Sequence, residues 1–99
     1  MENNGKILIV DDEPFNVRIL AEYLSLADYA AETAADGVIA WELLSNNPNA
    51  YDAVLLDRMM PNMNGMEVLV KMKAHPQLKQ LPVIMQTAAA SKQDILDGL

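Results

Sequence analysis

The chain has 99 residues, 52% of them hydrophobic, which suits one packed domain and is too apolar for a disordered tail. Its net charge of −7 argues against the phosphate backbone of nucleic acids as a partner. The chain has no cysteine, no secretory signal and no apolar run of the roughly 18 residues that cross a bilayer. We therefore expect a cytoplasmic domain that binds neither membranes nor nucleic acids.

The first half of the chain alternates between strand-like and helix-like segments. Residues 6–10, KILIV, form an apolar run that predicts a strand buried on both faces. Residues 14–26 predict a helix, because Pro14 suits a first helical position and apolar residues recur at helical spacing. Residues 29–34, YAAETA, predict a short second strand, and residues 36–47 predict a second helix.

The same alternation continues in the second half. Residues 53–56, AVLL, predict a third buried strand, and residues 63–75 predict a third helix. Residues 81–87, LPVIMQT, predict a fourth strand, and Ser91 is the expected N-cap of a further helix. Strands and helices at such short spacings predict βαβ units, and hence a doubly wound α/β fold with a parallel sheet.

Polar side chains follow the ends of three predicted strands. Asp11 and Asp12 come after the first strand, Asp57 after the third, and Thr87 ends the fourth. The carboxyl ends of parallel strands lie on one edge of the sheet, where ligands bind in open α/β folds. We expect these side chains to meet there, provided that the first and third strands are neighbours.

Three carboxylates in one place repel one another, by about 1 kcal/mol for each pair at 4 Å in water and more at lower dielectric. Either protons are shared or a cation fills the space, and an all-oxygen site suits Mg²⁺, with Mn²⁺ as an alternative. A magnesium ion with open positions could bind phosphate oxygens, Asp57 could then attack phosphorus, and the Thr87 hydroxyl could donate to a phosphoryl oxygen.

Three segments together resemble a known family. ILIVDDEPFNVRIL, DAVLLDRMMPNMNGMEVL and PVIMQTA are similar to the signature segments of receiver domains of bacterial two-component response regulators. They occur in the family's order and at its spacing, and the resemblance runs from residue 6 to the end of the chain. It implies a single receiver domain with a flavodoxin-like sheet of strand order 2-1-3-4.

The resemblance also implies a set of roles. Asp57 would accept a phosphoryl group from a sensor histidine kinase, a phosphotransfer protein or a small phosphodonor. Asp12, Asp57 and the backbone carbonyl of Met59 would ligate Mg²⁺ directly, and Asp11 would act through water. The domain would be a phosphoacceptor and not an enzyme, at most catalysing its own phosphorylation and dephosphorylation.

Further positions match the family's switch and its loop after the third strand. Thr87 and the backbone of Ala88 would bind the phosphoryl group and switch the output, while Pro61 and Gly65 would shape the loop. Receivers continue into a fifth strand that carries a lysine, and this chain ends before it, so we expect an incomplete receiver without that lysine. The open edge of the fourth strand predicts that this form either self-associates or is poorly stable.

Two other functions remain as alternatives. A Mg²⁺-dependent phosphohydrolase would also form an acyl phosphate on aspartate, but such enzymes place Asp-x-Asp on the first strand, whereas Asp11 and Asp12 are adjacent and Asp57 follows the third strand. A receiver-like scaffold would bind partners without stable phosphorylation, and the absence of the family lysine favours this second alternative.

Overall fold

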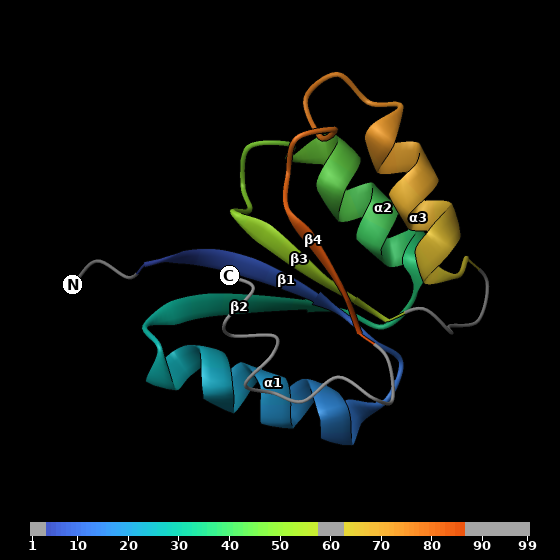
Figure 1. Cartoon of the computed structure of the whole chain (residues 1–99). Coiled ribbons are helices and arrows are strands. Elements are labelled where there is room, and N and C mark those ends of the chain that lie inside the picture. Colours follow the sequence, from blue (N-terminus) through green and yellow to red (C-terminus); the bar gives the residue numbers. More distant parts are fainter. Residues whose placement is uncertain (1–3, 58–62, 87–99) are drawn as a thin grey trace.

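A computed structural model describes residues 4–57 and 63–86, within which four strands alternate with three helices. The strands form one parallel sheet with the order β2-β1-β3-β4 (Figure 1). In chain order the elements are β1 Gly5–Val10, α1 Pro14–Leu26, β2 Tyr29–Ala34, α2 Gly37–Asn46, β3 Ala53–Asp57, α3 Gly65–Lys73 and β4 Val83–Gln86. The parallel α/β fold, its strand order and the pairing of the first strand with the third are therefore confirmed.

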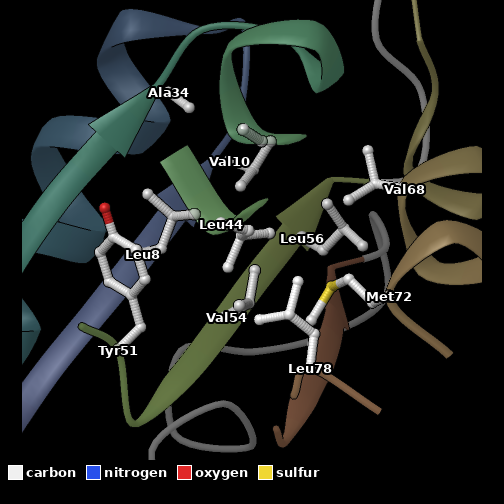
Figure 2. Packing of buried hydrophobic residues seen from close by; sticks show 11 residues of the cluster. Leu8, Val10, Ala34, Leu44, Tyr51, Val54, Leu56, Val68, Met72 and Leu78 are labelled. Carbon is white, nitrogen blue, oxygen red and sulfur yellow. The ribbon is translucent and has the colours of Figure 1, made fainter. Parts of the chain in front are cut away.

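Helices cover both faces of the sheet, which explains why its central strands are apolar without interruption. α1 lies on one face and α2 and α3 lie on the other (Figure 1). Ile7 and Ile9 of β1 pack with Leu20 and Leu24 of α1. The alternate residues of β1 and β3 face the second layer, where they form a cluster shown in Figure 2 with Leu44, Val68, Met72 and Leu78. Both sides of β1 and β3 are thus core, as in other buried parallel strands.

The helix starts follow local sequence signals. The side chains of Glu13, Asp36 and Asn64 cap α1, α2 and α3, and each accepts a hydrogen bond from a backbone N–H of the first turn. Pro14 occupies the first turn of α1, where its missing N–H costs nothing. Within the described ranges, no helix is both long and apolar enough to cross a bilayer.

Two predicted elements are shorter in the structure. The fourth strand begins at Val83 instead of residue 81, and the carbonyl of Pro82 accepts the N–H of Val54 at 2.9 Å just before it. The third helix covers Gly65–Lys73 because Asn64 is its cap and the chain turns from Ala74 onward. The helix predicted to begin at Ser91 lies outside the described residues.

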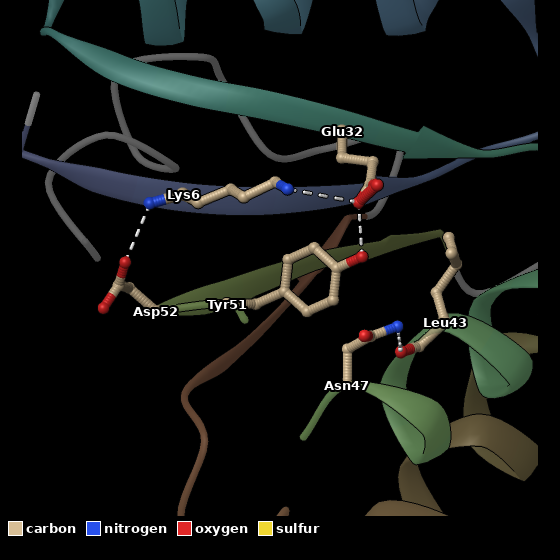
Figure 3. Close-up of polar contacts among 6 residues, drawn as sticks. All are labelled: Lys6, Glu32, Leu43, Asn47, Tyr51 and Asp52. Atoms are coloured by element: carbon tan, nitrogen blue, oxygen red, sulfur yellow. Dashed lines mark hydrogen bonds and ion pairs between the residues drawn. The ribbon is translucent and has the colours of Figure 1, made fainter. Parts of the chain in front are cut away.

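A polar cluster ties the beginnings of β1 and β3 to β2, at the end of these strands opposite Asp11 and Asp57 (Figure 3). The backbone N–H of Lys6 donates to the carboxylate of Asp52 at 2.7 Å. The Lys6 ammonium lies 3.6 Å from a Glu32 oxygen and 5.5 Å from the centre of the Tyr51 ring. The Tyr51 hydroxyl donates to the same Glu32 carboxylate. These contacts link the strands at one end of the sheet, and the acids Asp11 and Asp57 lie at the opposite end.

Candidate functional site

The three predicted acids meet at the carboxyl edge of the sheet. Asp57 is the last residue of β3, and Asp11 and Asp12 directly follow β1. The register of the two strands pairs Val10 with Leu56, so the chain brings Asp11 beside Asp57 one residue further on. The carboxylates of all three residues offer oxygen atoms that lie within 4.8 Å of one another. This spacing is close enough for one cation to contact all three.

The three carboxylates differ in their surroundings. Asp11 is only 4% exposed, Asp57 is half-buried and Asp12 is exposed. Asp11 Oδ1 accepts the backbone N–H of Glu13 at 2.9 Å, and the Asp11 N–H donates to the carbonyl of Ala34 at 3.1 Å. Asp11 is therefore held in place from both its backbone and its side chain, whereas Asp12 faces solvent.

The charge state of Asp11 reflects this crowding. Burial raises the pKa of Asp11, the hydrogen bond from the Glu13 N–H lowers it in part, and the neighbouring charges of Asp57 and Asp12 raise it again. A divalent cation bound between the three carboxylates would offset this repulsion. Because every donor in the cluster is a hard carboxylate oxygen, the site fits Mg²⁺ or Mn²⁺ and does not fit a soft metal.

A cavity of about 290 Å³ opens next to the acidic cluster, between the start of α1 and the end of β2. Asp11 and Asp12 are among its lining residues, and so are Arg18 and Thr33. The sequence did not point to Arg18 or Thr33, because their proximity to the acids depends on how α1 lies against β2. The only signal is the position of Arg18 four residues after Pro14, which puts both on one face of the helix.

The other predicted site residues divide into two groups. Gly65 is the buried first residue of α3, immediately after its cap, and its predicted role in shaping the loop stays a prediction. The remaining four lie outside the described residues: Met59, Pro61, Thr87 and Ala88. Their predicted roles therefore stay predictions.

Comparisons with known proteins agree with this geometry. Residues 7–99 match the model of a protein family, the response regulator receiver domain. The chain is 38% identical to the response regulator PleD of Caulobacter vibrioides over 96 residues, which is 97% of this chain and 21% of that protein. It is 38% identical to the transcriptional regulatory protein SrrA of Staphylococcus aureus over 95 residues, which is 96% of this chain and 37% of SrrA. The chain thus spans between 21% and 37% of the length of these relatives.

Solved structures are similar over nearly the whole chain. The N-terminal domain of a response regulator receiver protein from Methanoculleus marisnigri superimposes with a TM-score of 0.79 at 35% identity, covering 95% of this chain and 76% of that one. The Mn²⁺-bound form of the response regulator Rcp1 superimposes with a TM-score of 0.78 at 29% identity, covering 95% and 73%. With the sheet order and the acidic edge described above, these matches show that the chain belongs to the response regulator receiver domains of two-component signalling.

Proposed function

We propose that this domain accepts a phosphoryl group on Asp57 and transmits it as a signal. The observation that carries the proposal is the convergence of three carboxylates from the ends of β1 and β3 within 4.8 Å of one another. Asp11, Asp12, Asp57 and the backbone carbonyl of Met59 would hold Mg²⁺. Such an ion supplies positive charge that neutralises the phosphoryl oxygens as the group is transferred.

The nucleophile in this proposal is a carboxylate oxygen of Asp57. The oxygen forms a bond to phosphorus while the bond from phosphorus to the donor's imidazole nitrogen breaks, and the electron pair stays with the imidazole. The product is an acyl phosphate on Asp57. β3 presents this carboxylate from a rigid position, because the strand residues before it are fully buried.

The buried Asp11 contributes to the site through the position of its carboxylate. Its Oδ1 atom accepts the Glu13 N–H, and this hydrogen bond orients the carboxylate beside the position proposed for the cation. The exposed Asp12 is free to adjust to the ion. This division gives the site one fixed oxygen and one adaptable oxygen, a combination that suits an ion exchanged with solvent.

The donor in the proposal is the phosphohistidine of a sensor histidine kinase or of a phosphotransfer protein, in the cytoplasm. Thr87 and the backbone of Ala88 would bind the phosphoryl oxygens and pass the change to the following segment. The domain would act as a phosphoacceptor that catalyses only its own phosphorylation and dephosphorylation, not as an enzyme acting on other substrates.

The test is intact mass after incubation with acetyl phosphate and Mg²⁺. We expect the mass of one phosphoryl group to be added to the wild type, and no addition in Asp57→Asn or in the presence of EDTA. Asp52→Asn is the matched control, because it removes an acid at the other end of β3 and should leave the addition intact. A folded wild type that binds Mg²⁺ but gains no mass would favour the scaffold function instead.

A further inference from the structure

The cavity beside the acidic cluster has a defined position relative to Asp57. In the sheet, β1 lies between β2 and β3. Asp57 ends β3, Asp11 and Asp12 follow β1, and the cavity reaches the end of β2 at Ala34. The cavity therefore adjoins Asp11 and Asp12 on the β2 side, and Asp57 lies on their other side, at the end of β3.

The walls of this cavity combine apolar and cationic character. Pro14, Val17 and Ala34 give it apolar walls, and Arg18 is the one cation among the described residues that line it. Within the described part of the chain, Arg18 takes part in no salt bridge. A guanidinium without a carboxylate partner can bind a ligand carboxylate through two parallel hydrogen bonds.

We propose that this cavity receives the leaving group of the phosphodonor, and that Arg18 favours donors that release a carboxylate. The inference rests on the proposed phosphoacceptor role of Asp57 and concerns which donors serve it. The volume of about 290 Å³ holds a small acyl group. Arg18 is then a specificity-determining residue for small acyl phosphates.

The chemistry of two small donors separates the role of Arg18 from that of the acidic cluster. With acetyl phosphate, an Asp57 oxygen bonds to phosphorus while the bond from phosphorus to the acetyl oxygen breaks. The electron pair stays on that oxygen, so acetate leaves with a full negative charge, which Arg18 stabilises. With phosphoramidate, the phosphorus–nitrogen bond breaks and the already protonated nitrogen leaves as neutral ammonia, which Arg18 does not stabilise.

The experiment measures the rate of phosphorylation by intact mass with each donor at fixed Mg²⁺ and ionic strength. For Arg18→Gln we expect a fall of about tenfold with acetyl phosphate, the size of one charge-assisted hydrogen bond at a solvent-exposed site. With phosphoramidate we expect less than about a twofold change. Lys79→Gln is the matched control, because it removes the same charge from an exposed residue in the segment after α3.

Each outcome bears on the inference. An equal fall with both donors, or no fall with acetyl phosphate, would overturn it and leave the proposed role of Asp57 standing. A similar fall in Lys79→Gln would also overturn it, because net charge alone would then explain the effect. Failure of the wild type to gain a phosphoryl group from either donor would instead remove the proposed function itself. Arg18 is exposed, so Arg18→Gln should melt at the wild-type temperature.

Discussion

Gly37, the first residue of α2, lies so close to the chain before α3 that no side chain fits there. A Cβ atom at this position would lie 2.1 Å from the carbonyl oxygen of Met63 and 2.7 Å from its Cβ. The obstacle is backbone as well as side chain, so it cannot be relieved by a rotamer change. An ordinary carbon–oxygen contact is roughly 3.5 Å, so Gly37→Ala must push α2 and the Met63 segment apart by about 1.4 Å.

We expect Gly37→Ala to lower the free energy of unfolding by about 2 kcal/mol, within the range of other overpacking substitutions. Alanine is the better helix former, so intrinsic propensity alone predicts the opposite sign. For a domain of this size, 2 kcal/mol corresponds to a fall in melting temperature of about 8 to 16 °C. The single tryptophan, Trp41, packs against the core from α2, and its fluorescence can follow urea unfolding.

The control for this substitution is Val38→Ala, which trims an exposed side chain in the same turn of α2. We expect it to change the free energy of unfolding by less than about 0.5 kcal/mol. Unchanged or increased stability in Gly37→Ala would refute the reasoning, because it would mean that α2 and the Met63 segment do not approach as closely as the structure has them.

Two further substitutions test the polar groups. Tyr51→Phe should cost about 1 kcal/mol at pH 7, because it removes the hydroxyl that donates to the half-exposed Glu32. Burial and Glu32 raise the pKa of Tyr51, so its contribution is complete below about pH 10 and is lost as the pH rises further. The difference in free energy of unfolding between the wild type and Tyr51→Phe, measured in urea, should therefore shrink above pH 10. A constant difference would contradict this account of the Tyr51 hydrogen bond. Asp11→Asn keeps the acceptor for the Glu13 N–H but removes a charge that burial and two carboxylates disfavour. Without divalent ions at pH 7, urea unfolding should give Asp11→Asn a free energy of unfolding about 1 kcal/mol higher than that of the wild type. The pKa of Asp11 is raised, so the wild type recovers stability as the pH falls towards 4, where the gap should close. Mg²⁺ should stabilise the wild type more than Asp11→Asn, and Glu22→Gln, an exposed acid on α1, should show neither effect.

The elements that could be predicted from the sequence are those whose signals are local. The apolar runs of β1 and β3 indicate strands buried on both faces without reference to their neighbours. The caps at Asp36 and Asn64 act within one turn of the helices that they begin. The meeting of Asp11 with Asp57 also follows, because a parallel sheet places both strand ends on one edge once β1 and β3 are paired.

What could not be predicted depends on contacts between distant segments. The approach of Gly37 to Met63 joins residues that are separated by a whole strand, and no local pattern marks it. The cavity with Arg18 and Thr33 exists only because α1 crosses beside the end of β2. The sequence also gives no sign of which of two adjacent acids is buried. Asp11 is buried and Asp12 is exposed, because successive residues at a strand end point in different directions.

The buried position of Asp11 is itself an argument for a ligand at this edge. A carboxylate 4% exposed beside two others opposes folding, and a fold selected for stability alone would place a neutral or apolar side chain there. Asp11 is nevertheless held by the N–H of Glu13, so the backbone turn before α1 is built around its oxygen. Repulsion that the fold maintains in this way is relieved by a bound cation or by protonation of a carboxylate, which is why the acidic edge is the part of this domain that should respond to ions and to phosphoryl transfer.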